Sequence, residues 1–228
     1  MKSRTAESSS ALPADRVRPA PPEAQAIFGE RLPLAERFHA SLCEAGPIRG
    51  LNGPREVPVL WERHLINSAL LALLPAEILP VGASVCDVGS GGGLPGIPLA
   101  IARPDLAVTL VDPLQRRTDY LREIIDDLGL ANLRVIRARA GEPDSAAQIG
   151  RYEVVTSRAV APLGRLLEWC VPLTVRGGWI AAMKGRRAEE EIADLTSRQR
   201  RLVGDIDMVD LTSPAGAHTA RVLLTQPK

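Results

Sequence analysis

Cysteines and aromatic residues are scarce in this sequence. Its 228 residues include three cysteines, and Phe, Trp and Tyr together make up 3% of the chain. Cys43, Cys86 and Cys170 lie far apart, form no CxxC pair and show no metal-ligand spacing to the histidines, which excludes a disulfide framework. We therefore expect buried thiols in a reducing compartment, a cytoplasmic location and no metal site.

The sequence also lacks a strong charge imbalance and a long apolar run. Lys and Arg number 28 against 27 for Asp and Glu, so the net charge is +1. A nucleic acid would therefore have to be bound by a local basic patch rather than by the field of the whole molecule. No stretch is both long and apolar enough to span a bilayer, and we expect no membrane contact.

Composition divides the chain into a tail, a helical part and a larger domain. Residues 1–22 mix Ser, Ala, Pro and Arg with little to bury, which predicts a disordered tail. Residues 23–80 read as a helical cap, with one helix ending at Gly46 and a later helix burying a stripe at helical spacing. The members of that stripe are Trp61, Leu65, Ser68 and Ala72.

From residue 81 to 228, β-rich runs alternate with helical runs. This alternation predicts an α/β domain whose parallel sheet is covered on both faces, with the ligand at the carboxyl edge of the strands. The expected strands are 83–88, 106–112, 133–138, 152–157, 177–184, 206–211 and 219–226, and the expected helices are 96–104, 114–130, 162–175 and 187–202.

A glycine-rich turn, "DVGSGGGLPG", follows the first expected strand. Gly89, Gly91 and Gly93 permit positive φ and allow a ligand to lie against the backbone. Residues 91–96 also satisfy the GxGxxG pattern of dinucleotide-binding turns, which alone is weak evidence. An ordinary tight turn is the structural alternative.

Two acidic residues bear on which ligand the turn holds. Asp87 ends the first strand, where a carboxylate would be unfavourable beside a pyrophosphate but suits the ammonium and sulfonium of S-adenosylmethionine. Asp112 ends the second strand, where it can accept both ribose hydroxyls of either cofactor. The sequence thus favours the methyl donor and leaves an NAD-dependent oxidoreductase as the alternative.

Five segments together resemble a known family. They are "RHLINSALL", "DVGSGGGLPGIPLA", "LVDPLQRRTDYLRE", "VTSRAVAPLGRLLEWCVPL" and "GGWIAAMKG". In this order they resemble the RsmG (GidB) family, bacterial methyltransferases of guanine N7 in 16S ribosomal RNA. The resemblance covers residues 51 to 185 and implies a class I (Rossmann-like) S-adenosylmethionine-dependent fold, with a seven-strand sheet and a small N-terminal helical part.

The resemblance also implies site residues. Gly89 and Leu94 would contact the cofactor, with Ala140 and Gly141 after the third strand and Arg158 of "TSRA" as a contact to cofactor or substrate. Two positions depart from the family. Gly141 stands where a glutamate is usual, so a side-chain contact there is lost, and Asn67 stands where many members have aspartate.

Methyl transfer to guanine N7 requires no general base, because this nitrogen carries an in-plane lone pair and no proton. The sequence therefore assigns no catalytic base, and Ser157 and Arg158 are candidates to position the substrate. For Arg158 the structural alternative is an ion pair that holds the cap on the sheet. The candidate RNA contacts are Arg63, His64, Lys184 and Arg186, each of which can equally be a surface or packing residue.

The leading hypothesis is an S-adenosylmethionine-dependent methyltransferase whose partner is 16S ribosomal RNA or the small ribosomal subunit. A ribosomal RNA-binding protein that keeps the fold without its chemistry is a further alternative. An intact Asp87, glycine turn and Asp112 argue against that loss of chemistry.

Overall fold

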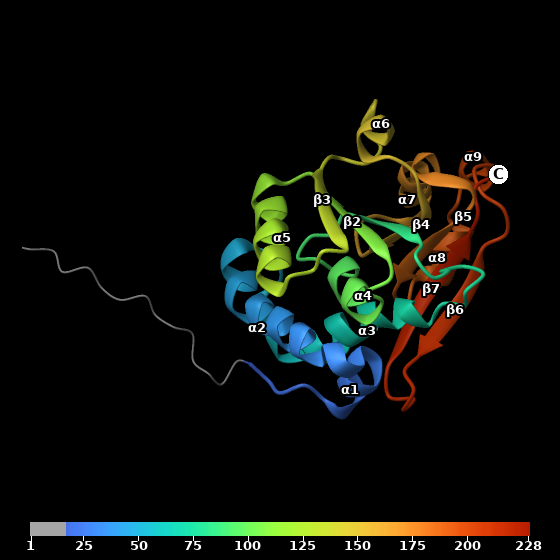
Figure 1. Ribbon diagram of the computed structural model, residues 1–228. Coiled ribbons are helices and arrows are strands. Elements are labelled where there is room, and N and C mark those ends of the chain that lie inside the picture. The colour runs from blue at the N-terminus through green and yellow to red at the C-terminus, as the bar shows by residue number, and fades with distance from the viewer. Residues whose placement is uncertain (1–16) are drawn as a thin grey trace, which may run out of the picture.

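Seven strands form one sheet in the order β3-β2-β1-β4-β5-β7-β6 (Figure 1). The computed structural model describes residues 17–228. The strands are β1 Ser84–Val88, β2 Ala107–Asp112, β3 Leu133–Arg137, β4 Tyr152–Arg158, β5 Thr174–Lys184, β6 Asp207–Thr212 and β7 Thr219–Thr225. All seven expected strands are present, with ends shifted by a few residues.

The parallel sheet inferred from the alternation is correct for β1 to β5 and needs one correction. β7 inserts between β5 and β6 and runs antiparallel to both. The hairpin that joins β6 to β7 explains this direction, because a short connection can link only antiparallel neighbours. Parallel neighbours β1 and β4 place the carboxyl ends of their strands at one edge, where Asp87 pairs with Thr156 in register.

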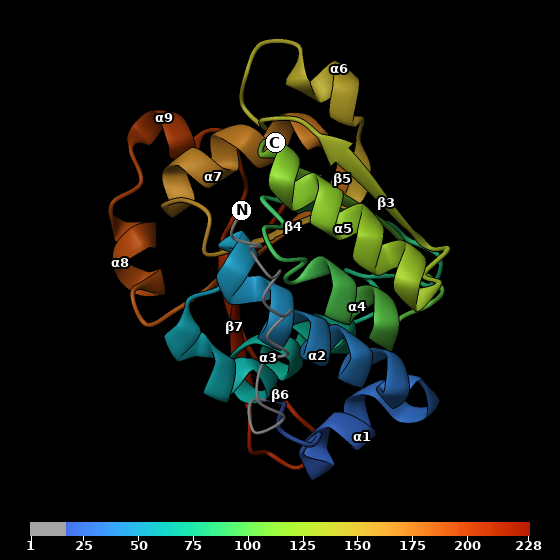
Figure 2. The same ribbon diagram turned by 90° about the vertical axis from the view of Figure 1, so that its left-hand side faces the viewer.

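One face of the sheet carries α4, α5 and the N-terminal helical part, which face the viewer in Figure 2. Its helices are α1 Pro22–Phe28, α2 Leu32–Arg49, α3 Asn67–Ala69, α4 Gly96–Ala102 and α5 Gln115–Leu128. Short 3₁₀ turns η2 Gly29–Arg31, η3 Pro54–Val59 and η5 Leu70–Leu73 and the π-helical segment η4 Leu60–Ile66 connect them.

The other face carries α6 Ser145–Ile149, α7 Leu163–Cys170, α8 Ala188–Ala193 and α9 Ser197–Arg200, with the 3₁₀ turn η6 Val171–Leu173. The sequence predicted one helix over 187–202, which is wrong. Thr196 interrupts it and caps α9 by accepting the backbone N–H of Gln199, whose side chain bonds back to the Thr196 N–H. This reciprocal capping box is a recognisable start signal, and it outweighs the continuous helical pattern.

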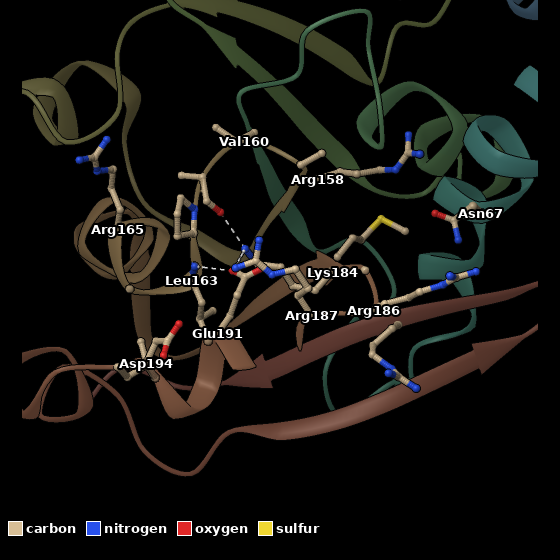
Figure 3. Close-up of a pocket in the computed structure, with 18 of the residues that line it drawn as sticks. Asn67, Arg158, Val160, Leu163, Arg165, Lys184, Arg186, Arg187, Glu191 and Asp194 are labelled. Atoms are coloured by element: carbon tan, nitrogen blue, oxygen red, sulfur yellow. Dashed lines mark hydrogen bonds and ion pairs between the residues drawn. The ribbon is translucent and has the colours of Figure 1, made fainter. Parts of the chain in front are cut away.

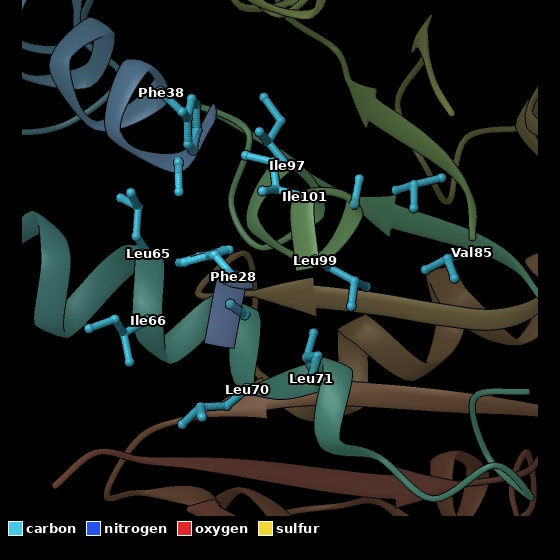
Figure 4. Close-up of a cluster of buried hydrophobic side chains, with 14 of the residues drawn as sticks. Phe28, Phe38, Leu65, Ile66, Leu70, Leu71, Val85, Ile97, Leu99 and Ile101 are labelled. Atoms are coloured by element: carbon cyan, nitrogen blue, oxygen red, sulfur yellow. The ribbon is translucent and has the colours of Figure 1, made fainter. Parts of the chain in front are cut away.

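The predicted cap and the sheet share one hydrophobic core (Figure 4). Phe38 of α2 and Leu65 of η4 pack with Ile97 and Ile101 of α4, and all four are fully buried. Trp61, Leu65 and Ser68 of the predicted stripe are buried as well. The helical part is therefore a layer of the same folding unit rather than an independent domain.

One boundary in the helical part differs from expectation. α2 passes through Gly46 and ends at Gly50, whose φ of 65° is the left-handed conformation of a helix C-cap. Gly46 serves close packing instead, because a Cβ there would overlap the side chain of Asn52.

Most of the predicted disordered tail, residues 1–16, lies outside the described residues. The remainder, from 17 to 22, packs on the helical part. The indole of Trp61 donates to the carbonyl of Arg18 over 3.0 Å, and Arg18 forms an ion pair with Glu62.

The shared core predicts cooperative unfolding. Phe38→Ala should lower the free energy of unfolding by about 3–5 kcal/mol, because it deletes a fully buried aromatic side chain. In a variant in which Trp169 and Trp179 are replaced by Phe, the fluorescence of Trp61 and the far-UV circular dichroism should report one denaturant transition.

Ile48→Ala is the matched control for that prediction. Ile48 is 79% exposed, and its truncation should change stability by less than about 0.5 kcal/mol. A cap that melts before the sheet would show that the two layers are separate units.

Candidate functional site

The glycine turn between β1 and α4 uses five of the six N–H groups of residues 89–94 within the protein. The N–H groups of Gly89 and Ser90 both donate to the carbonyl of Val111 on β2. Gly91 donates to the carboxylate of Asp112 over 3.1 Å, and Gly93 and Leu94 donate to the carbonyl of Ser90. A pyrophosphate cradle needs free backbone donors, so this turn does not form one.

The carboxylate of Asp87 lies at the N-terminus of α4. In a dinucleotide-binding turn the phosphates of the cofactor occupy this position. The side chain of Asp87 is fully buried, and Oδ2 accepts the N–H of Gly96, the first residue of α4, over 3.0 Å. Burial raises the pKa of Asp87 to about 7. A second anion at this position would meet a buried carboxyl group, and the dinucleotide alternative therefore has no support in the geometry.

The remaining oxygen of Asp87 tests whether S-adenosylmethionine fits. Oδ1 is buried and has no hydrogen-bond partner among residues 17–228. A buried carboxylate oxygen without a donor is costly, and the ammonium of the cofactor supplies both a donor and a positive charge. The site residues therefore fit this cofactor, and Asp87 could hold its amino-acid end.

Two glycines of the turn have conformations that exclude a side chain. Gly89 has a φ of 76°, and a Cβ there would lie 2.5 Å from Cγ2 of Val160, which follows β4. Gly93 has a φ of 95°, and its Cβ would lie 2.4 Å from Cδ1 of Ile97. The turn is thus closely packed against the loop after β4 and against α4.

Asp112 lies at the end of β2, as predicted, but its carboxylate already has three protein donors. Oδ2 accepts from Gly91 N and from Arg117 Nη1, and Oδ1 accepts from Leu114 N over 2.9 Å. The residue is 1% exposed. These contacts connect the glycine turn to the start of α5, and the ribose contact stays a prediction.

The Ala140–Gly141 pair follows β3 as predicted, and Gly141 is covered by an aromatic ring. Its φ is 87°, and a Cβ would lie 2.1 Å from Cδ1 of Trp169 on α7. A glutamate at this position would need Trp169 to move. No motif in the sequence indicates the contact between Gly141 and Trp169, because Trp169 lies 28 residues further along the chain.

A cleft of about 1280 Å³ opens beside the carboxyl ends of β4 and β5 (Figure 3). Arg158 and Lys184, which end these strands, contribute to its wall. Besides Arg158, three arginines of the wall form no ion pair with any residue from 17 to 228, and they are Arg63, Arg165 and Arg186. Two others are neutralised, Arg187 by Glu190 and Arg221 by Asp210.

Lys184, whose RNA contact stays a prediction, fixes the loop between β4 and α7. Its Nζ donates to the carbonyl of Ala161 and to Glu191, both at 2.7 Å, and its side chain is 6% exposed. Glu191 also accepts the N–H of Leu163 (Figure 3). The charge of Lys184 is thus balanced within the protein, and the cleft depends on its arginines for free positive charge.

Arg158 connects the end of β4 to the helical part. Its Nη2 donates to the carbonyl of Arg63 over 2.7 Å and to Nδ1 of His64 over 3.1 Å. His64 Nε2 lies 2.6 Å from Oε2 of Glu56. The structural alternative for Arg158, a direct ion pair with the cap, is therefore replaced by a hydrogen-bonded connection through His64.

The other predicted substrate-positioning residue, Ser157, is 2% exposed on β4 and does not line the cleft. Only some of the predicted RNA contacts line the cleft. Arg63 and Arg186 line the cleft, while His64 lies behind Arg158. Sequence reasoning missed Glu56 and Glu191, whose partners are set by tertiary contacts rather than by any motif.

Comparison with known proteins covers both the helical part and the sheet. Residues 31–210 match the family model GidB, described as rRNA small subunit methyltransferase G. The chain belongs to the GidB family. Relatives named Ribosomal RNA small subunit methyltransferase G are similar to this chain over most of their length.

The first of these relatives, from Corynebacterium efficiens, is 53% identical over 172 residues, which are 75% of this chain and 72% of that protein. The second, from Rhodococcus jostii, is 53% identical over 188 residues, or 82% of this chain and 81% of that protein. The family resemblance stated from the five sequence segments is confirmed.

A solved structure supports the fold. The S-adenosylmethionine-dependent methyltransferase SibL superposes with a TM-score of 0.53 at 18% identity, over 71% of this chain and 55% of SibL. The chain thus has the Rossmann-like α/β fold of this methyltransferase. Its membership of the GidB family makes it an S-adenosylmethionine-dependent methyltransferase. No helix within residues 17–228 has the length and apolar character to span a membrane. The same part of the chain has no cluster of His, Cys, Asp and Glu arranged to bind a metal.

Asp87 should make cofactor affinity depend on pH. In the free protein its pKa is raised to about 7, so below that pH the carboxyl is largely protonated and attracts an ammonium weakly. The Kd of S-adenosylhomocysteine, measured by calorimetry, should therefore fall about tenfold from pH 6 to pH 8.

In Asp87→Asn this dependence should vanish, and at pH 8 the affinity should be at least about tenfold weaker than in the wild type. Asp119→Asn, which removes an exposed carboxylate of α5, serves as the control and should behave like the wild type. Parallel pH profiles in the wild type and Asp87→Asn would contradict the assignment.

Proposed function

We propose that this protein transfers the methyl group of S-adenosylmethionine to N7 of a guanine in 16S ribosomal RNA of the small subunit. The observation that carries the proposal is the GidB match over residues 31–210, with relatives at 53% identity named for small-subunit RNA methylation. The local geometry agrees with it, because the arginine-lined cleft adjoins the strand edge that carries Asp87 and the glycine turn.

The chemistry places few demands on acid–base groups. Bound S-adenosylmethionine supplies an electrophilic methyl group on a positively charged sulfur. Guanine N7 forms the new bond with its in-plane lone pair as the sulfur–carbon bond breaks, and the positive charge passes to the base. No proton leaves N7, so the protein has to align the reactants and exclude water rather than provide a base.

The described residues meet the demand for alignment. Arg158 stands at the end of β4 with one guanidinium nitrogen fixed by the helical part, and its other donors are left for guanine O6 or a phosphate. The unpaired Arg63, Arg165 and Arg186 on the cleft wall suit the phosphates of a folded RNA strand. Lys184 and Glu191 hold the intervening loop in place.

The sequence leaves two other functions open. An NAD-dependent oxidoreductase is opposed by the occupied N–H groups of the turn and by Asp87 at the start of α4. A non-catalytic RNA-binding protein is opposed by the orphaned Asp87 oxygen, which a purely structural turn has no reason to retain.

Methyl transfer to small-subunit RNA is the direct test. Incubation of purified 30S subunits or naked 16S RNA with labelled S-adenosylmethionine, followed by nucleoside analysis, should yield labelled 7-methylguanosine. Gly89→Val should abolish the label for two reasons. Valine strongly disfavours the positive φ of residue 89, and its side chain would collide with Val160. Another methylated nucleoside would overturn the N7 assignment, and RNA binding without label would favour the non-catalytic alternative.

Arg158→Lys tests the positioning role. Lysine keeps the charge but loses the planar fork that bonds the helical part and the substrate together, so the single-turnover rate should fall by about tenfold or more. The melting temperature should change little. A large fall in melting temperature with a normal rate in the folded fraction would give Arg158 a purely structural role.

A further inference from the structure

Arg158 is a predicted substrate contact that joins the sheet to the helical part, and two residues outside the cleft hold its side chain. Glu56 in η3 and His64 in η4 stand in a line with Arg158, at 2.6 Å and 3.1 Å for successive contacts. Neither Glu56 nor His64 lines the cleft. Their geometry therefore bears on Arg158 rather than on a bound substrate.

The line of contacts permits one hydrogen arrangement. A guanidinium has only donors, so Nδ1 of His64 must accept from Arg158. The hydrogen of a neutral imidazole then lies on Nε2, where it donates to the carboxylate of Glu56. A hydrogen on Nδ1 would set donor against donor and release Arg158 from His64.

We propose that Glu56 and His64 are positioning residues for the methyl transfer, and that Glu56 selects the His64 tautomer that holds Arg158 in its productive orientation. The proposal rests on the proposed function for its kinetic consequence, whereas the tautomer itself is independent of any substrate. It adds Glu56, which no motif in the sequence identified, and gives His64, a candidate RNA contact in the sequence, a positioning role behind Arg158.

The charges around His64 agree with a neutral ring. Burial lowers the pKa of His64, and the neighbouring Arg158 and Arg63 lower it further, while Glu56 opposes them. The hydrogen bond from His64 holds the pKa of Glu56 below its usual range, so that carboxylate stays ionised. Acidification below the His64 pKa adds a proton at Nδ1, and the contact to Arg158 is lost.

Three substitutions separate the roles within this line. Glu56→Gln is nearly isosteric, but it removes the negative charge and offers Nε2 either an acceptor oxygen or a donor NH2, so the preference for the Nε2–H tautomer weakens. His64→Gln can still accept from Arg158 and donate to Glu56, yet it does not titrate. His64→Leu removes both contacts. Glu62→Gln is the control. It removes a carboxylate of the same helical part, but one that forms an ion pair with Arg18 and not with His64.

At pH 8 and saturating cofactor, single-turnover methylation should slow by about tenfold in Glu56→Gln and in His64→Leu. It should stay within about threefold of the wild type in His64→Gln and Glu62→Gln. Because the pKa of His64 is lowered, its protonation belongs to pH values below 6.5, the ordinary histidine value. Below that pH the wild-type rate should decline as His64 gains a proton, and the His64→Gln rate should decline less. Saturating cofactor removes the separate effect of Asp87 on binding.

Nitrogen-15 NMR of histidine-labelled protein reads the tautomer without RNA or cofactor. The wild type should show a protonated Nε2 and an unprotonated Nδ1 for His64, and Glu56→Gln should show a shifted tautomer population. A wild-type Nδ1–H tautomer, or an unchanged spectrum in Glu56→Gln, would overturn the proposal whatever the enzyme's substrate.

Kinetics supply the second decisive outcome. A normal rate with a lowered melting temperature in Glu56→Gln would reduce the pair to a structural contact and overturn the positioning role. If the wild type itself transfers no methyl group to ribosomal RNA, the proposed function fails, and the NMR result still stands as a statement about how Arg158 is held.

Discussion

The buried carboxyl group of Asp87 is the constraint on which the site depends. Its Oδ2 takes the N–H of Gly96 and so occupies the start of α4, while its Oδ1 has no donor within residues 17–228. A buried carboxyl group with one oxygen left without a hydrogen-bond donor lowers the stability of the fold unless a ligand supplies that donor. The same feature is unfavourable for a phosphate and suits a cation, which agrees with the cofactor of the GidB family.

The helical part has a function because it shares the core of the sheet. Phe38 and Leu65 pack on α4, which begins at the glycine turn, so the position of η3 and η4 is fixed relative to β4. Only such a fixed layer can hold a 2.6 Å contact between Glu56 and His64 in line with Arg158. The packing of the helical part on the sheet therefore determines the orientation of the Arg158 guanidinium.

Much of this architecture follows from the sequence. Alternating strand and helix patterns locate all seven strands, and the family resemblance is confirmed by the GidB match. What the sequence does not predict are pairings between distant residues of ordinary type. Lys184 looks like a free cation in its segment, but Glu191 and the Ala161 carbonyl bind it. Gly46 looks like a helix end, but contact with Asn52 makes it a packing position.

The distribution of positive charge in the cleft fits a reaction in which the base becomes cationic. A mobile cation beside N7 would oppose that change, since like charges in a water-poor site repel strongly. Arg158 is restrained by a carbonyl and a neutral histidine, so its charge stays where O6 or a phosphate can use it. The unpaired Arg63, Arg165 and Arg186 lie on the wall, where the proposed function would place RNA phosphates beside them. The ionised Glu56 behind His64 further offsets the charge of Arg158, and tautomer selection and charge balance are therefore served by the same carboxylate.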